Sequence, residues 1–378
     1  MRTTTARTAG IFLVAGAMLL AAGACTKKSD QPASAAATAT SAADLGGMDA
    51  LIAAAKKEGS LNLMALPRDW AGYGALMDGF ATKYGIKVTD DNPGAASADE
   101  VSAITSLKGQ GRAPDAVDVG TSFAVSGAAQ GIYAPYKVST WSDIPDAQKA
   151  ADGTWFGDYG GYMSIGCDAA KVTACPTTIA DLAKPDYKGK VALTGDPLKS
   201  NSAMMAIWTA ALATGGSLDN IQPGIDFFAK LKSEGNFVPV KATAATVQSG
   251  ETPIIVDWDY LNAGKTKDLA NSGVKWTVAV STDATIGGFY AQAISKYAPH
   301  PAAARLWEEY LYSNEGQNGF LKGFARPTRM AAMQQAGTVD PALANLLPPA
   351  GTNAVYPTDP QANKAQNTLT QNWANTVK

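Results

Sequence analysis

The chain alternates between segments with apolar residues at helical spacing and short runs of consecutive apolar residues. Residues 48–58 and 70–84 place apolar side chains on one face of a helix, and residues 61–66, 86–89 and 116–119 have the composition of strands. A glycine follows each helical segment, which is typical of a helix end. Because strands and helices alternate, we predict a sheet that is largely parallel.

The same alternation continues over the rest of the chain. Strands are predicted over residues 162–167, 191–194, 254–257, 274–280 and 289–294. Helices are predicted over 201–214 and 221–231, and from Pro301 onward the chain is expected to be helical. With 378 residues, of which 46% are hydrophobic, the chain buries a large core but is too long for one compact lobe. We therefore expect two lobes.

The first 25 residues have the organisation of an export signal. Arg2 and Arg7 precede an apolar stretch over residues 9–22, which is too short for a comfortable membrane span. Small residues then lead to Cys25 and resemble the lipobox at which bacterial lipoprotein precursors are cleaved and the cysteine is acylated. We therefore expect Cys25 to carry a lipid at the mature N-terminus. An ordinary signal peptide with an incidental cysteine is the alternative.

Composition and cysteine spacing add two expectations for an exported chain. Residues 26–44 are small and polar, a composition that does not bury enough surface to offset the entropy of ordering, so we predict a flexible tether. Cys167 and Cys175 are spaced to close a small disulfide loop in an oxidising compartment, with two free thiols as the alternative. No second cluster of Cys or His accompanies them, so we expect no metal site.

Charge and motifs exclude several functions. The 31 basic and 33 acidic residues give a net charge of −2 without a long basic run, so we expect no nucleic-acid partner. The chain contains no GxSxG, HExxH, CxxC or Walker motif. Ser272 and Lys275 match SxxK by spacing, but they lie in a polar turn without partner motifs, which disfavours a serine enzyme. His300 lies at a predicted helix start, where a surface capping role is favoured over catalysis. We expect neither an enzyme nor a bound cofactor.

Two segments of the chain resemble a known family. Residues 176–193 (PTTIADLAKPDYKGKVAL) resemble the P-x-T-x-x-D-L-x-x-P-x-Y-K-G-K-V segment of type 2 periplasmic solute-binding proteins. Residues 298–304 (APHPAAA) with residues 312–317 (YSNEGQ) resemble the APHPEAA and SPEGQ segment of the same proteins. The resemblance points to the branch that binds ferric ion, polyamines, thiamine and aminoethylphosphonate.

The resemblance implies a two-lobed α/β fold with a mixed, mostly parallel sheet in each lobe and crossover strands as the hinge. By this analogy, residues 45–160 and 284–378 form lobe one, residues 161–283 form lobe two, and the ligand lies between them. It also implies a monomeric receptor on the extracytoplasmic face of the membrane, held there by its lipid alone. Such a receptor delivers its solute to an ABC permease that is driven by a separate ATPase.

The strand end at residues 254–260 (IIVDWDY) is the richest candidate site. Asp257 and Asp259 alternate there with Trp258 and Tyr260. Aromatic faces attract a desolvated ammonium group and carboxylates accept its hydrogen bonds, so this segment predicts a site for an organic cation. The alternative is that an aspartate caps the next helix and the aromatic side chains pack in the core. We favour a ligand role for at least one of these residues.

Other candidates follow predicted strands or lie at the predicted crossovers. Each has a structural alternative, either as a helix cap or as a packing residue, and capping is the favoured role for Asp69. These candidates are Asp69, Trp70, Ser122, Phe123, Tyr162, Ser200, Ser202 and Tyr290. A polyamine or thiamine-like cation is the first ligand hypothesis. Phosphonate stays open through residues 200–202, and ferric ion is disfavoured because the chain has no adjacent pair of tyrosines.

Overall fold

The computed structural model describes residues 35–349, 351 and 353–377. The predicted signal peptide, Cys25 and residues 26–34 of the predicted tether lie outside the described residues. No helix in the described part of the chain is both long and apolar enough to cross a membrane.

The N-terminal part of the fold alternates helices and strands as predicted. Its helices are α1 (Ala35–Thr38), α2 (Met48–Glu58), α3 (Tyr73–Tyr84), α4 (Ser97–Ser106) and α5 (Thr121–Ala129), with a 3-10 turn η1 (Ala43–Leu45). Its strands are β1 (Ser60–Met64), β2 (Lys87–Asp91), β3 (Ala116–Gly120) and β4 (Tyr133–Ala134). Strands β1 and β2 form a parallel pair. They lead into α3 and α4, so loops at the carboxyl ends of both strands connect to helices.

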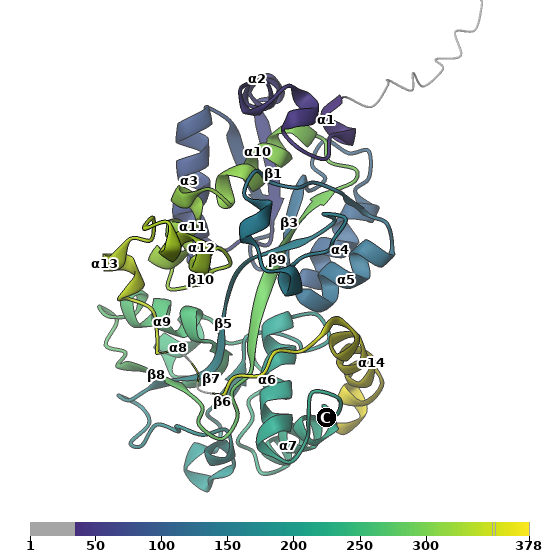
Figure 1. Ribbon diagram of the computed structural model, residues 1–378. Coiled ribbons are helices and arrows are strands. Elements are labelled where there is room, and N and C mark those ends of the chain that lie inside the picture. The colour runs from purple at the N-terminus through teal and green to yellow at the C-terminus, as the bar shows by residue number, and fades with distance from the viewer. Residues whose placement is uncertain (1–34, 350, 352, 378) are drawn as a thin grey trace, which may run out of the picture. The chain divides into compact units, whose positions relative to one another are not determined.

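A long strand, β5 (Phe156–Asp168), connects the two halves of the main sheet (Figure 1). Its first half pairs with β9 (Gly287–Ser295), and its second half pairs with β7 (Ile254–Trp258) and β8 (Trp276–Val280). The main sheet runs in the order β3-β9-β5-β7-β6, where β6 is Val191–Leu193. A short strand, β10 (Arg326–Pro327), also pairs with β5. The sheets are mixed, as expected, but among the described strands only β1–β2 and β6–β7 pair in parallel. The crossing strands β5 and β9 pair antiparallel with all their neighbours.

The remaining helices follow the sheet strands or cover them. They are α6 (Asn201–Ala213), α7 (Gln222–Ser233), α8 (Ala244–Ser249), α9 (Asp259–Asp268), α10 (Pro301–Leu311), α11 (Asn314–Lys322), α12 (Met330–Gln335), α13 (Pro341–Ala344) and α14 (Asp359–Thr376). Short 3-10 turns are η2 (Trp141–Asp143), η3 (Asp146–Gln148), η4 (Ala180–Ala183) and η5 (Pro185–Tyr187). Helix α6 is apolar on all sides and almost wholly buried, as expected of a core helix.

Helix α14 packs beside α7 and α5 (Figure 1). Trp373 lies against Phe228 with ring centroids 6.2 Å apart, and the amide of Asn372 donates to Gln222 at 2.7 Å. Helix α7 belongs to the segment that the sequence assigns to lobe two, whereas α14 itself was assigned to lobe one. The boundaries of the two lobes therefore stay a prediction, with α14 in contact with helices from both segments.

The predicted tether is shorter than expected. Residues 35–44 pack against the fold, where Ala36 and Ala39 are buried. The guanidinium of Arg305 donates from Nε to the Ala39 carbonyl at 2.8 Å and from a terminal nitrogen to the Ala37 carbonyl at 3.1 Å. Small side chains let this backbone approach α10 closely, so the prediction of a flexible tether is wrong for residues 35–44.

Two predicted caps are also wrong. Helix α3 begins at Tyr73 with Gly72 as its N-cap, so Asp69 is not a cap but lies in the preceding turn. His300 occupies the N-cap position of α10, but its ring does not cap the helix. Instead Nδ1 lies 2.9 Å from the fully buried carboxylate of Asp115, which raises the pKa of the imidazole. Asp115 thus holds the histidine in a structural role, since it also accepts the backbone N–H of His300.

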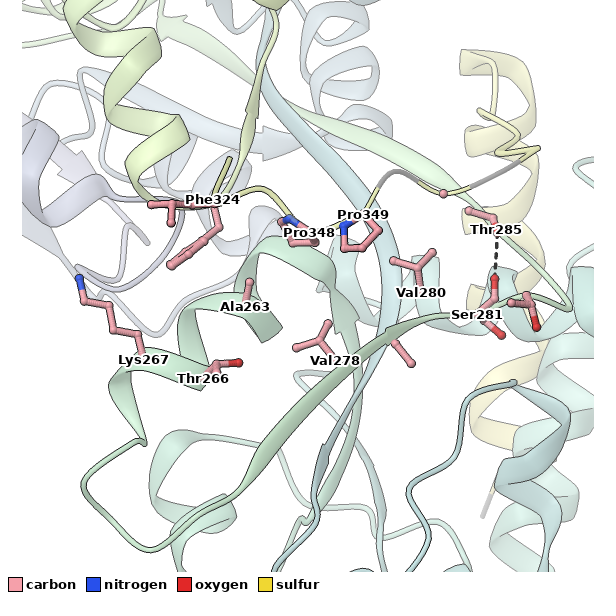
Figure 2. A pocket seen from close by; sticks show the side chains of 14 residues that line it. Ala263, Thr266, Lys267, Val278, Val280, Ser281, Thr285, Phe324, Pro348 and Pro349 are labelled. Carbon is pink, nitrogen blue, oxygen red and sulfur yellow. Dashed lines mark hydrogen bonds between the residues drawn. The ribbon is translucent and has the colours of Figure 1, made fainter. Parts of the chain in front are cut away.

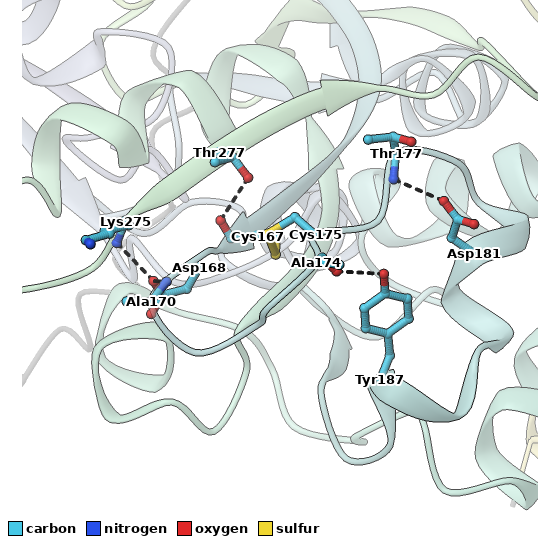
Figure 3. The surroundings of a disulfide bond; sticks show 10 residues. All are labelled: Cys167, Asp168, Ala170, Ala174, Cys175, Thr177, Asp181, Tyr187, Lys275 and Thr277. Carbon is cyan, nitrogen blue, oxygen red and sulfur yellow. Dashed lines mark hydrogen bonds between the residues drawn. A yellow bond between two sulfur atoms is a disulfide. The ribbon is translucent and has the colours of Figure 1, made fainter.

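The predicted disulfide is present. Cys167 ends the pairing of β5 with β7, and Cys175 lies in the loop that follows, with the two Cα atoms 5.9 Å apart (Figure 3). Hydrogen bonds support the same loop, because the Tyr187 hydroxyl donates to the Ala174 carbonyl at 2.7 Å and Thr277 donates to the Cys167 carbonyl at 3.2 Å.

Candidate functional site

A cavity of about 420 Å³ lies at the carboxyl ends of strands β1, β2, β3, β6 and β7. Loops that follow β1, β2 and β6, together with residues of the helices α4, α6 and α9, supply most of its lining, and Tyr290 of β9 supplies part of one wall. In open α/β sheets, the loops after the strands carry helix N-termini and polar side chains into one crevice. The topology therefore gathers residues from distant parts of the sequence at one place.

Six of the twelve predicted ligand residues line this cavity. They come from the loop after β1, the loop after β6, the end of β7 and the crossing strand β9, and they are Asp69, Trp70, Ser200, Ser202, Asp257 and Tyr290. The structure thus brings together residues that the sequence separates by up to 221 positions, from Asp69 to Tyr290.

Asp257 is the buried carboxylate of this predicted set. Its side chain is 1% exposed, with Oδ2 3.4 Å from the Lys265 ammonium and Oδ1 3.5 Å from the Thr194 hydroxyl. Burial raises the pKa of Asp257, although the positive charge of Lys265 acts in the opposite direction. Asp257 therefore presents a carboxyl group that is only partly neutralised by its neighbour.

Aromatic side chains form one side of the cavity and its support. The rings of Trp70 and Tyr290 meet edge to face with centroids 5.3 Å apart, and Trp70 Nε1 donates to the Tyr159 hydroxyl at 2.5 Å. Behind them, Trp258 and Tyr260 stack with centroids 6.1 Å apart, and both are 1% exposed. Trp258 and Tyr260 therefore hold the aromatic wall in place rather than line the 420 Å³ cavity.

The structure does not bring three other predicted residues to the cavity. Asp259 is completely buried and forms an ion pair with Arg326 at 2.6 Å, and it accepts the backbone N–H of Tyr162 at 2.9 Å. The ring of Tyr162 lies against the same guanidinium, 4.7 Å from its centre. Phe123 packs in a separate hydrophobic cluster around α5 and β9. All three side chains make structural contacts within the fold instead.

Ser122 and Trp258 line a second, narrow cavity of about 20 Å³. This space is close to the volume that one water molecule needs. The buried hydroxyl of Ser122 has no hydrogen-bond partner among the described residues. The narrow cavity does not admit a solute of several heavy atoms.

Sequence reasoning missed several charged residues of the main cavity. Five of them are acids and three are lysines, namely Asp99, Glu100, Asp118, Asp196, Asp268, Lys199, Lys241 and Lys265. Asp118 carried one usable signal, because it is a lone carboxylate inside the apolar strand AVDV. The others lie on helices or loops, where a charged residue is ordinary and predicts nothing about a site.

A larger cavity of about 630 Å³ lies on the other face of α9 (Figure 2). Helix α9 presents Leu261, Lys265 and Asp268 to the first cavity and Ala263, Thr266 and Lys267 to this one. Its other walls are mostly apolar side chains, which include Val278, Val280, Phe324 and Pro348. It contains no buried charged group, so the smaller cavity is the better candidate for a polar solute. No group of three or more metal-ligating side chains occurs within the described ranges.

Comparisons with known proteins bear on the family and the fold. A sequence profile of the family described as bacterial extracellular solute-binding protein matches residues 118–354. No match was found among curated proteins.

Solved structures of low sequence identity share the fold. The periplasmic binding protein AfuA from Actinobacillus pleuropneumoniae, bound to fructose-6-phosphate, has a TM-score of 0.67 at 17% identity, over 84% of this chain and 98% of that one. AgtB from A. tumefaciens R10, in complex with agropinic acid, has a TM-score of 0.65 at 18% identity, over 84% and 98%. A ferric binding protein from Campylobacter jejuni has a TM-score of 0.62 at 17% identity, over 84% and 99%.

The profile covers well over half of the chain, and the neighbouring structures have the two-lobed fold of periplasmic binding proteins. These proteins bind a small solute outside the cytoplasm for an ABC importer. The chain belongs to the bacterial extracellular solute-binding proteins.

Proposed function

We propose that this protein captures a small organic cation, of the polyamine or thiamine-like class, in the cavity of about 420 Å³ and releases it unchanged to its importer. Noncovalent attraction is sufficient for this function, because binding and release leave the covalent bonds of the solute intact.

The charge of the cavity lining is the observation that carries the choice of a cation. Seven acidic residues line the cavity, namely Asp69, Asp99, Glu100, Asp118, Asp196, Asp257 and Asp268, against three lysines, namely Lys199, Lys241 and Lys265. A concave site with low-dielectric walls concentrates such a charge surplus and attracts ions of the opposite sign. Burial raises the pKa values of Glu100 and Asp118. The other five acids still outnumber the three lysines, so the lining favours a positively charged solute.

Two further features support an organic cation. Trp70 and Tyr290 offer aromatic rings at the cavity, and aromatic faces attract ammonium groups within about 6 Å. Asp257 lies at the end of β7 with its carboxyl group buried. An amine at this place gains a charge-assisted hydrogen bond that water does not compete for.

An anion such as a phosphonate is the second candidate, and the N-terminus of α6 favours it. Ser200 caps this helix by accepting the N–H of Ala203 at 3.4 Å, and Lys199 precedes it at the same cavity. Helix N-termini and lysines attract anions. However, Ser202 already lies 3.2 Å from the Tyr290 hydroxyl. The larger number of acids makes this candidate the weaker one.

Closure of the two lobes around the solute is the mechanism that we propose. Contacts across the cavity support it, because Lys241 Nζ donates to the Gly94 carbonyl at 2.9 Å and the Ala98 N–H donates to the Lys199 carbonyl at 3.4 Å. A ligand that contacts both sides favours the closed population, which a permease then recognises. The lobes would be residues 45–160 with 284–378, and residues 161–283. We further propose a monomer anchored by lipid at Cys25, with a separate ATPase.

Isothermal titration calorimetry on the exported chain tests the choice of ligand. Putrescine, spermidine and thiamine are titrated beside phosphate and aminoethylphosphonate at constant ionic strength. We expect at least one of the cations to bind and the two anions not to bind. Asp257→Asn and Trp70→Ala should each weaken capture of that cation by about 1–3 kcal/mol, because they remove a charge-assisted hydrogen bond and a cation–π contact.

Asp186→Asn is the matched control, because Asp186 is an exposed carboxylate outside the cavity. It should leave the affinity unchanged. Binding of an anion without binding of any cation would replace the proposal by the second candidate. Turnover of a bound solute would contradict the assignment as a receptor.

A further inference from the structure

One carboxyl oxygen of Asp118, on β3, accepts a hydrogen bond, and the other has no hydrogen-bond partner within the described part of the chain. The side chain is 4% exposed and lines the cavity of about 420 Å³. Its Oδ2 accepts the hydroxyl of Tyr159 at 2.7 Å, whereas its Oδ1 has no hydrogen-bond partner among the described residues. A buried oxygen that lacks a partner loses free energy relative to water, and natural folds rarely tolerate one without a reason. Asp118 therefore lines the cavity with one carboxyl oxygen whose hydrogen-bonding capacity the described residues do not use.

The groups around Asp118 are acids and hydroxyls. They come from α3, α4, β5, β9, α9, α10 and the residue after α10, and they are Tyr73, Glu100, Asp158, Tyr159, Tyr290, Tyr260, Glu308 and Tyr312. The amide Gln292 lies opposite Asp118 across the β3–β9 pair. Lys199 and Lys265 line the same cavity. Neither lysine forms a hydrogen bond or ion pair with Asp118 in the described part of the chain.

This setting opposes a negative charge on Asp118 as long as no cation is nearby. Desolvation raises the pKa of Asp118 to about 7, and burial also raises the pKa values of Glu100 and Asp158 well above their usual range. Several buried carboxyl groups without a basic partner do not all ionise together. Asp257 differs, because Lys265 stands 3.4 Å from it and already supplies a positive charge.

We propose that Asp118 anchors the positive group of the solute, and that the carboxyl group exchanges its proton for that group. The proton leaves the Asp118 carboxyl for solvent, and the ligand cation takes its place beside the resulting carboxylate. The step therefore balances in charge. Capture of one cation is therefore coupled to release of nearly one proton below neutral pH. This inference rests on the proposed function.

The sign of the pH dependence follows from this exchange. Below the pKa of the empty site Asp118 holds a proton that must leave before the cation binds, so affinity falls as the pH falls. The dissociation constant should rise by up to about tenfold per pH unit, and by roughly 10–30-fold from pH 7.5 to pH 5.5. Above neutral pH the carboxyl is already ionised, and the affinity should become independent of pH.

Calorimetry in two buffers tests the proton directly. Putrescine, spermidine and thiamine are each titrated into the wild-type protein at pH 6.5, in PIPES and in ACES, which differ in their enthalpies of protonation. The difference in observed heat counts the protons released, and we expect about 0.7 per bound cation. The titrations are repeated at pH 5.5 and pH 7.5 to obtain the change in dissociation constant.

Two variants identify the source of the proton. Asp118→Asn should bind the same cation more weakly, release no proton and lose the pH dependence. Asp257→Asn should also bind more weakly, but it should keep the proton release and the pH dependence. If Asp118→Asn does not fold, the wild-type measurement still overturns the proposal when no proton is released, and Asp257→Asn still tests the other buried carboxyl group of the cavity.

The outcomes separate this inference from the proposed function. A cation that binds the wild type without proton release overturns the role of Asp118 and leaves the cation class standing. Proton release that persists in Asp118→Asn overturns the assignment to this residue. If none of the three cations binds, both the proposed function and this inference fail.

Discussion

Asp257 and Asp259 lie two residues apart at the end of β7 and serve different purposes. Asp257 lines the cavity next to Lys265, whereas Asp259 is completely buried beside Arg326, 67 positions away in the sequence. The backbone turns from strand to helix between them, because α9 begins at Asp259. Two identical side chains therefore face two different environments, one open to a solute and one closed by the fold.

The ion pair of Asp259 predicts a large loss of stability in Arg326→Met. Methionine keeps the apolar stem but leaves a fully buried carboxylate without a positive partner, which costs about 3–5 kcal/mol. Urea unfolding at neutral pH measures this loss. Arg68→Met is the control, because the Arg68–Asp78 pair has both side chains more than 60% exposed and should contribute less than about 1 kcal/mol. Equal losses in the two variants would show that burial does not decide the effect.

At the scale of elements, β5 is held to its following loop by a covalent bond. Cys167 lies at the buried end of the strand, and Cys175 follows eight positions later (Figure 3). The Cys167–Cys175 disulfide limits the conformations of the unfolded chain, and a loop of this length corresponds to about 2–3 kcal/mol. The pairing of β5 with β7 and β8 ends at the same place, so the bond also fixes the end of that part of the sheet.

Reduction should therefore lower the stability of the wild type by about 2–3 kcal/mol. Thermal unfolding with and without dithiothreitol measures the change. The Cys167→Ala, Cys175→Ala double variant should unfold at a lower temperature than the oxidised wild type and should not respond to dithiothreitol. A wild type that is indifferent to the reductant would mean that the loop is already ordered by its hydrogen bonds, such as the one from Tyr187 to the Ala174 carbonyl.

At the scale of the whole molecule, the proposed closure would bring backbone and side chains of distant segments together over the cavity. Lys241 precedes α8, whereas Gly94 follows β2, and the lysine ammonium donates to the glycine carbonyl at 2.9 Å. The two residues belong to different proposed lobes, so under the proposed closure this contact should form only when the two sides approach each other. The free energy of this contact should therefore slow the dissociation of a bound solute.

Lys241→Met should speed the release of a bound cation by about 2–10-fold and change the rate of association much less. Stopped-flow fluorescence of the tryptophan signal measures both rates. Lys57→Met, an exposed lysine on α2 outside the cavity, is the control and should leave both rates unchanged. An effect of Lys241→Met on association alone would indicate electrostatic attraction rather than a contact of the closed state.

Several features of this protein depend on short stretches of sequence, and these were predicted well. Apolar spacing predicted most helices and strands, and the short separation of Cys167 and Cys175 predicted their disulfide. Loops after predicted strands contained Trp70, Ser200 and Asp257, all of which line the cavity. These signals are local, because a helix face, a strand end or a small loop is defined by residues close together in the chain.

Other features needed the tertiary structure, because their cause lies far away in the sequence. Only the pairing of β9 with both β3 and β5 places Asp118 beside Tyr159 and at the cavity. The distant Arg326 pairs with Asp259 and keeps it away from the cavity, and α10 helps to order residues 35–44 through Arg305. Sequence alone determined which segments become strands, helices and strand-end loops, whereas the fold decided which buried charges receive a partner, since that partner is chosen by distance in space.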